Sequence, residues 1–174
     1  MKNQRICIIG DGLTGLTTAL AMSNLNVDID LYFSKKKTIN HDKRITAISN
    51  SNYNFLADIN KSNIKKLFWP CKKIHLFYQR NTNIKNFLNF SEKNTLMHIF
   101  ENNKFKKELL KQLKRKNVKF INYAVKNIDH TSNRIKIHKK YYNYDLIILC
   151  LGNNSRLYNN IIKNRSIYKD YKEI

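Results

Sequence analysis

The sequence predicts a mixed α/β domain built in three layers, and three observations support that prediction. The chain has 174 residues but only four glycines, and Gly10, Gly12 and Gly15 lie close together. Average usage would give about a dozen, so we expect these four where a turn or a close backbone approach excludes a side chain. The glycine cluster stands between an apolar run and a helical pattern, and a later apolar run ends at Gly152.

The N-terminal segment fits a strand, a helix and a second strand in succession. The apolar run RICIIG begins at about residue 5 and is typical of a buried parallel strand. Residues 13–25 follow a helical pattern that contains Leu16 and Leu20, and residues 27–33 (VDIDLYF) form a second apolar run. A glycine motif between the strand and the helix of such a unit predicts a Rossmann-like fold.

The middle of the chain predicts a small antiparallel sheet insertion. Residues 34–44 are polar and form a connection, and residues 49–60 can start a short helix with Ser49 or Ser51 as its N-cap. Alternating or apolar segments then predict strands that share one antiparallel layer, at residues 72–79, 87–91 and 95–100.

The second half completes a single domain that we assign to residues 1–174. Its clearest feature is an amphipathic helix over residues 101–116, in which Phe105, Leu109 and Leu113 repeat at helical spacing. Short strands follow, a buried strand then ends at glycine, and a polar tail begins at Asn153. These four predicted strands are residues 118–123, 124–129, 134–140 and 144–152.

Composition limits the classes of function. The net charge is +21, from 33 Lys and Arg against 12 Asp and Glu, which suits a basic module that binds nucleic acid or an anionic membrane. The basic residues are spread along the chain and Lys, Asn and Ile dominate, so we favour compositional drift and expect no nucleic-acid partner. The three cysteines and five histidines have no disulfide or metal-ligand spacing. We therefore predict no metal site and no catalytic side chain.

The glycine spacing itself predicts a phosphate site. In GDGLTG the first glycine permits the turn out of the strand, the second lets backbone amides approach a pyrophosphate, and the third lets the helix pack on the strand. The helix N-terminus favours negative charge. The carboxylate expected at the end of the second strand is replaced by Phe33, and the nearest acid, Asp30, is mid-strand. Lysines at 35–37 leave an NADP 2′-phosphate as an alternative, although a solvated loop is the simpler interpretation.

Four segments in order resemble the FAD-dependent aromatic hydroxylases, and nearest to them the branch of ubiquinone biosynthesis. The segments are GDGLTG, DKRITAISNSNYNFL, HIFENNKFKKELLKQL and YDLIILCLGNNSRL, and they cover nearly the whole chain. The matching positions within the last three are Asp42, Arg44, Ala47, Ile48, Ser49, Glu101, Asn102, Gly152, Asn154 and Ser155.

The resemblance implies FAD as cofactor, NAD(P)H as reductant and O2 as oxidant. It implies hydroxylation of an aromatic ring, here of a polyprenyl phenol or benzoquinol that precedes ubiquinone. The flavin performs the covalent chemistry in such enzymes, which agrees with the lack of a catalytic side chain. The cofactor-binding residues implied in this way are Gly10, Gly12, Gly15, Arg44, Val125 and Gly152, and Ala124 falls beside Val125 where the family's backbone meets adenine.

The chain departs from the family pattern at three positions and at its end. Phe33, Asn103 and Leu151 stand where the family has charged residues, and each lost contact is worth about 1–3 kcal/mol. The last residues, IYKDYKEI, resemble the entry to a substrate-covering sheet that would begin near residue 167. We therefore expect an N-terminal FAD-binding half that is incomplete as a catalyst alone. A truncated reading frame, a partner that supplies the rest, or a relic that binds nothing are the alternatives.

Two other classes of function stay open. One is an NAD(P)-dependent Rossmann oxidoreductase, and the other is a non-catalytic basic module that binds nucleic acid or anionic membrane. The partners that we expect are a small aromatic or polyprenyl substrate and a peripheral contact with a membrane or a hydroxylase complex. No signal peptide precedes the first strand, and no apolar run reaches the ~18 residues that span a bilayer. The expected location is the cytoplasm, with the inner membrane as a peripheral site.

Overall fold

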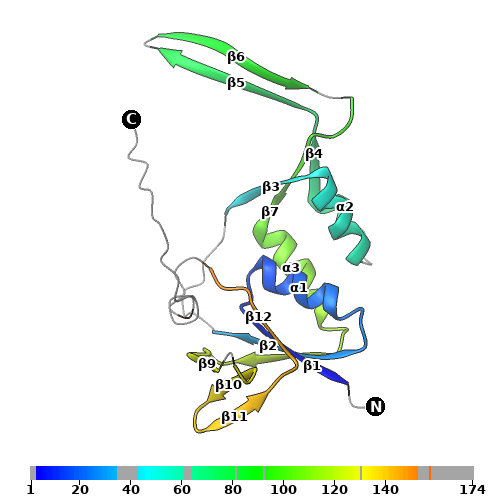
Figure 1. The fold of residues 1–174 in the computed structure, drawn as a ribbon. Helices are drawn as coiled ribbons and strands as arrows, with labels where there is room; N and C mark the ends of the chain where they lie inside the picture. Colours follow the sequence, from blue (N-terminus) through cyan, green and yellow to red (C-terminus); the bar gives the residue numbers. More distant parts are fainter. Residues whose placement is uncertain are drawn as a thin grey trace.

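A parallel sheet of four strands forms the middle layer of the lower part of the molecule in Figure 1. The computed structural model describes residues 3–34, 43–60, 64–80, 82–91, 93–129, 131–152 and 157. The sheet has the order β12–β1–β2–β8, with β1 Gln4–Ile9, β2 Val27–Phe33, β8 Val118–Asn122 and β12 Leu146–Leu149. The chain builds outward from β1 through β2 to β8 and then returns to the other side of β1. The predicted α/β fold class is thus confirmed, and β1 and β12 flank the point where the strand order reverses.

Two helices cover one face of this sheet, α1 Leu13–Met22 and α3 Asn102–Leu113 (Figure 1). Their apolar stripes, which include Leu16, Leu20 and Leu109, pack on alternate side chains of β1 and β2. The helix α1 is shorter than the predicted 13–25, because the chain turns at Ser23, whose hydroxyl donates to the Leu20 carbonyl at 2.7 Å.

A three-stranded antiparallel sheet covers the other face, with β9 Asn127–Asp129, β10 Arg134–Ile137 and β11 Lys140–Asn143. Two predicted strands here were wrong in extent. Residues 134–140 form two strands rather than one, because His138 adopts a positive φ of 53° in the turn. The segment 124–129 becomes a strand only at Asn127, and Val125 is buried in the connection. The parallel sheet is therefore the middle of three layers, as predicted.

The insertion between β2 and α3 contains a second antiparallel sheet in the order β3–β7–β4. Its elements are β3 Ile45–Ser49, α2 Asn50–Ile59, η1 Ile64–Leu67, β4 Phe68–Cys71 and β7 Met97–Glu101. The predicted N-cap is confirmed at Ser49, whose hydroxyl accepts from the Asn52 amide at 3.3 Å. The strands β3 and β4 were not predicted; β4 contains Pro70, which a strand tolerates at a sheet edge.

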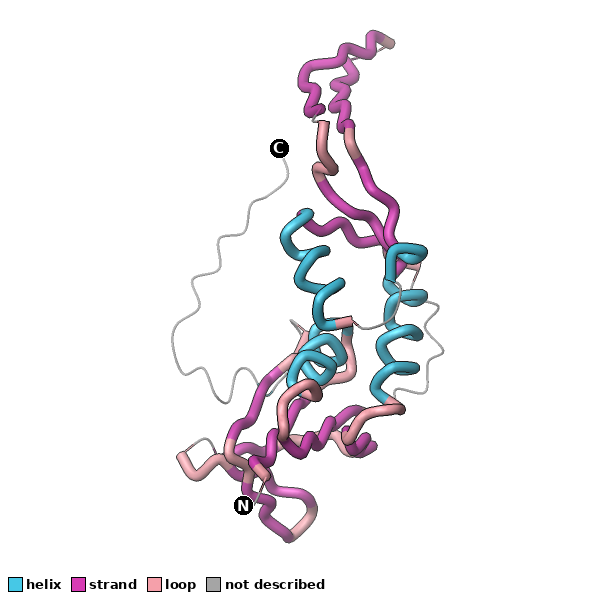
Figure 2. The backbone as a smooth tube through the Cα atoms, turned by 90° about the vertical axis from the view of Figure 1, so that its right-hand side faces the viewer, coloured by secondary structure: helices cyan, strands magenta, loops and turns pink. Residues whose placement is uncertain are grey.

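A two-stranded hairpin, β5 Lys73–Arg80 and β6 Asn83–Ser91, is separate from the other three sheets. It extends away from the other elements in the views of Figures 1 and 2, and every residue of β6 is exposed. The prediction that residues 72–79, 87–91 and 95–100 share one layer was wrong, because β7 pairs with β3 and β4 instead. Within the described ranges, no helix has both the length and the apolar character to cross a bilayer.

Candidate cofactor site

The turn after β1 leaves no space for side chains at two of its glycines. Gly10 has a φ of +120°, and a Cβ there would lie 2.2 Å from the carbonyl oxygen of Cys150, just after β12. A Cβ at Gly15 would lie 1.9 Å from the carbonyl oxygen of Gly10. Both distances are far inside van der Waals contact, so β1, α1 and the end of β12 can meet this closely only through glycine.

The N-terminus of α1 opens into free space beside that turn. Gly12 is the N-cap residue, in an extended conformation and without a side-chain cap, and the first turn has no acidic residue. A Cβ at Gly12 would meet no described atom within 4 Å. The helix therefore directs amide groups and the positive end of its dipole to an uncapped position at the carboxyl ends of β1 and β12. In open parallel sheets this crevice, where the strand order reverses, is the usual place for a ligand.

An ion pair joins this loop to α3. Lys106 Nζ lies 3.1 Å from the Asp11 carboxylate, and both side chains are partly exposed. Such an exposed pair contributes about 0–1 kcal/mol to stability, so its main effect is local charge. Lys106 offsets the acid that the sequence places between the glycines and holds an ammonium group beside the helix N-terminus. The sequence did not indicate Lys106, which lies three residues after Asn103 on α3.

A small pocket of about 160 Å³ adjoins the glycine turn at the carboxyl edge of the sheet. It brings together five positions singled out from the sequence, namely Gly10, Phe33, Ala124, Val125 and Leu151. The full lining is Ile9, Gly10, Asp11, Tyr32, Phe33, Ser34, Tyr123, Ala124, Val125, Leu151 and Leu157. Pockets that enclose a whole small-molecule ligand usually have volumes of about 300–1,000 Å³. This pocket is smaller, so it has room for only one end of a dinucleotide. Its walls are largely apolar, and Phe33 takes the position where a ribose carboxylate was expected.

Four of the predicted cofactor-binding residues lie outside this pocket lining, namely Gly12 and Gly15 in the glycine turn, and Arg44 and Gly152. Gly152 directly follows Leu151, and a Cβ at Gly152 would meet no described atom within 4 Å. Arg44 precedes β3 in the insertion, is exposed, and accepts a hydrogen bond at its carbonyl from the Asn102 amide at 3.1 Å. Asn102 itself is buried, and its side-chain oxygen accepts from the Thr46 hydroxyl at 2.6 Å. Asn102 therefore connects β3 to the start of α3 through these two hydrogen bonds.

Other predicted positions lie outside the described residues. These are residues 35–37, Asp42, Asn154, Ser155 and the segment from residue 167.

Asp30 is held by a structural network. Its carboxylate accepts from the Arg5 guanidinium at 2.8 Å and from the Tyr144 hydroxyl at 2.7 Å. The Tyr144 and Tyr32 hydroxyls lie 2.7 Å apart. Burial raises the pKa of Tyr32 to about 12 and also raises that of Tyr144. The network keeps both phenols neutral and fixes the Tyr32 ring against the pocket, so it does not replace the missing ribose carboxylate.

The described residues contain no group of His, Cys, Asp or Glu that could hold a metal ion. Burial raises the pKa of the Cys7 thiol to about 12 and also raises that of Cys150, so neither thiol is activated. His98 is buried and stacked on Tyr53 with ring centroids 3.8 Å apart. Cys7, Cys150 and His98 are therefore packed as structural side chains.

Comparison with known proteins defines the class of fold. No protein-family model and no curated protein matches the chain. Solved structures do: FqzB has a TM-score of 0.73 at 10% identity, over 94% of this chain and 40% of that one. The 2,6-dihydroxypyridine-3-hydroxylase of Arthrobacter nicotinovorans has a TM-score of 0.71 at 12% identity, over 94% and 40%. The p-nitrophenol 4-monooxygenase PnpA of Pseudomonas putida DLL-E4 has a TM-score of 0.64 at 16% identity, over 92% and 44%.

The chain thus has the α/β fold of these solved hydroxylase and monooxygenase structures. It spans less than half the length of these solved proteins.

Proposed function

We propose that this chain binds FAD and forms the cofactor-binding part of a flavoprotein monooxygenase that acts on an aromatic ring. The observation that carries the proposal is the glycine turn at the junction of β1 and β12. Gly10 and Gly15 are required there for packing, and the α1 N-terminus at Gly12 faces open space. The fold shared with solved hydroxylases supports FAD as the ligand.

In this proposal the chain's own residues do the binding. Amides at Gly12 and the first turn of α1 hold the diphosphate, and Lys106 adds a positive charge beside them. The pocket around Val125 holds the adenosine end against apolar walls, since Phe33 offers no carboxylate for a ribose hydroxyl. Arg44 and Gly152 contact the flavin end. Bound FAD would supply the redox chemistry that inserts one oxygen atom from O2, with NAD(P)H as the electron donor.

The substrate part of the proposal rests on the sequence resemblance. We infer a phenol or benzoquinol precursor of ubiquinone as substrate, and a catalyst that is incomplete without further polypeptide. The inference that the catalyst needs further polypeptide is supported by the length of the chain, which spans 40% of the 2,6-dihydroxypyridine-3-hydroxylase.

A flavin titration tests the cofactor. We expect the purified protein to quench FAD fluorescence saturably, and Gly12→Val to weaken FAD binding at least tenfold. The reason is that a Cβ at Gly12 meets no protein atom, so the variant can fold while its side chain fills the diphosphate position. Thermal unfolding of the same variant is the control, and its midpoint should stay close to that of the original protein.

Two results would contradict the proposal. One is equal FAD affinity for the original protein and Gly12→Val. The other is tighter binding of NAD+ or NADP+ than of FAD in the same titration, which would favour a nicotinamide-dependent oxidoreductase instead.

A further inference from the structure

The pocket beside the glycine turn has an aromatic side chain at the end of β2. Phe33 is the last residue of that strand and lines the pocket. Its ring packs edge to face on Phe120 of β8, with ring centroids 6.5 Å apart, and this contact holds it in place. Tyr123, Val125 and Leu151 form further walls. An aromatic ring therefore stands at the strand end where the ribose of a bound dinucleotide usually meets a carboxylate.

The two acids nearest to this strand end have partners elsewhere. Asp11 is the only acid among the described residues that line the pocket, and its carboxylate lies 3.1 Å from Lys106 Nζ on α3. Asp30 lies within β2 and outside the lining. Its carboxylate accepts from Arg5 at 2.8 Å and from Tyr144 at 2.7 Å. Asp11 is thus paired with α3 and Asp30 with the interior network, so neither takes the place of a carboxylate at Phe33.

The chemistry of these walls decides which part of an adenosine the pocket can recognise. A site that hydrogen-bonds a hydroxyl rejects an analogue that lacks it, because the polar group of the site then loses its partner. An apolar wall carries no such group, so it discriminates only weakly between a hydroxyl and a hydrogen. Aromatic side chains do attract the flat face of a base.

We propose that this pocket binds the adenine of a nucleotide and does not select at the 2′ position of its ribose. The ligand class is then adenine nucleotides with either ribose or 2′-deoxyribose, and Phe33 is the residue that sets this specificity. The inference rests on the proposed function, since it places the adenosine end of FAD in the pocket. It adds that the sugar contributes little to the affinity there.

Displacement of FAD by two nucleoside diphosphates tests the inference on the full chain. ADP and 2′-deoxy-ADP both carry adenine and a diphosphate, and they differ only in the 2′-hydroxyl. We expect both to displace FAD, measured as recovery of its fluorescence, with dissociation constants within about threefold of each other. This comparison uses the original protein, so it does not depend on the folding of a variant.

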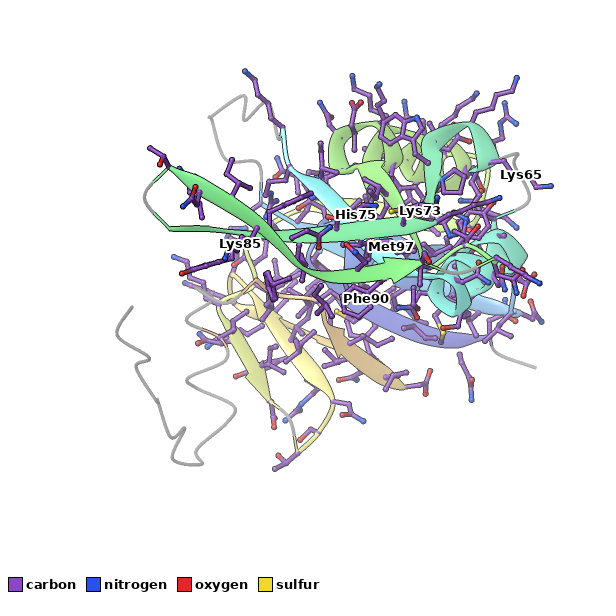
Figure 3. The ribbon with its side chains drawn as sticks, turned by 90° about the horizontal axis from the view of Figure 1, so that it is seen from above. Lys65, Lys73, His75, Lys85, Phe90 and Met97 are labelled. Carbon is purple, nitrogen blue, oxygen red and sulfur yellow. The ribbon has the colours of Figure 1, made fainter. Side chains whose placement is uncertain are left out.

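A carboxylate introduced at the strand end should create the missing selectivity. We expect Phe33→Glu to bind ADP at least tenfold more tightly than 2′-deoxy-ADP, because the new carboxylate accepts from the 2′-hydroxyl. Phe33→Leu stays apolar and should show no preference. Phe90→Glu makes the same exchange on the hairpin (Figure 3), at a residue outside the pocket lining, and should also show none. Circular dichroism checks that each variant is folded.

Three outcomes would overturn the inference while FAD binding stands. A preference of tenfold or more for ADP in the original protein would show that another group contacts the ribose hydroxyl. Failure of ADP to displace FAD would show that the adenosine end lies elsewhere. A folded Phe33→Glu without any preference would show that Phe33 does not face the ribose.

A protein that does not bind FAD at all would contradict the proposed function itself. Calorimetric titration with the same two diphosphates then decides the specificity of the pocket separately. Equal binding of both would support it, and binding of ADP alone or of neither would overturn it.

Discussion

Gly10 and Gly15 lie nearer to neighbouring backbone than any side chain permits. We predict that Gly10→Ala and Gly15→Ala each lower the free energy of unfolding by about 2–5 kcal/mol, from overpacking and, at Gly10, from the positive φ. Gly12→Ala should cost less than about 1 kcal/mol, because its Cβ meets open space at the N-cap. Urea unfolding measures all three. Equal costs at Gly12 and Gly15 would show that the turn is looser than its geometry indicates.

His98 gives the stability a pH dependence near neutrality. Burial lowers the pKa of this ring below its usual value, and the neutral ring stacks on Tyr53. The unfolded chain therefore binds the proton more readily, so stability is full above the unfolded pKa of about 6.5 and falls as the pH drops below it. Asp129 affects stability in a different pH range. Hydrogen bonds from Thr131 and Arg134 lower the pKa of its carboxyl group, so the stability that it contributes is lost only below about pH 4.

Urea midpoints measured between pH 5 and 8 test this effect. We expect His98→Phe, which keeps an aromatic ring against Tyr53, to flatten the decline on the acidic side. A decline of the same slope in the variant would assign the effect to other groups.

At the residue scale, the sequence motif predicted the site residues that lie close together in the chain. The positions of Gly10, Gly15 and Phe33 follow from a motif within one strand–helix–strand unit, so the sequence indicated them directly. The contact of Lys106 with Asp11 spans 95 positions and depends on how α3 packs beside α1. Tyr144 reaches Asp30 across 114 positions. Neither pair leaves a local pattern in the sequence.

At the scale of elements, burial decided which strands could be predicted. The strands β1, β2 and β12 are internal or packed on both faces, so they are near-continuous apolar runs. The strands missed were β3, β4 and β11, which lie at sheet edges. Pro70 in β4 also argued against a strand, and β11 is exposed throughout. At least half of the residues in each of β3, β4 and β11 are exposed, so their sequences carry a weaker apolar signal. The strand β12 also lies at a sheet edge, but it packs between two layers and its sequence is apolar throughout.

The helix α3 is fastened to the insertion by an aromatic cluster. The Phe105 ring lies 5.2 Å from Phe68 and 5.1 Å from Phe100 between centroids, and it is almost fully buried. We predict that Phe105→Ala lowers the free energy of unfolding by about 3–5 kcal/mol, because it removes a large buried ring and leaves a cavity.

The control for this change is Phe55→Ala on α2, where the ring is exposed and the cost should be below about 1 kcal/mol. Urea unfolding compares the two variants. A similar loss in both would mean that the cluster does not stabilise the junction of α3 with β4 and β7.

At the scale of the whole molecule, the three-layer domain followed from the glycine spacing and the buried runs, but the separate hairpin did not. Its strand pattern is ordinary, and only the structure shows that no described element covers it. The exposure of a strand depends on the elements that pack around it in the tertiary structure. The hydrophobic periodicity of the sequence carries no information about those elements.

Net charge is the remaining property of the whole chain, and it acts against compactness. Lys and Arg exceed Asp and Glu by 33 to 12, and such an excess destabilises a folded chain through self-repulsion. The ion pairs of Arg5, Lys104, Lys106 and Arg134 are partly exposed, and each contributes only about 0–1 kcal/mol. Screening should therefore remove more repulsion than attraction. We predict that the urea midpoint rises with sodium chloride from low ionic strength to about 0.5 M, because the Debye length shortens from about 30 Å at 0.01 M to about 4 Å at 0.5 M. A midpoint that falls with salt would show that specific ion pairs outweigh the general repulsion.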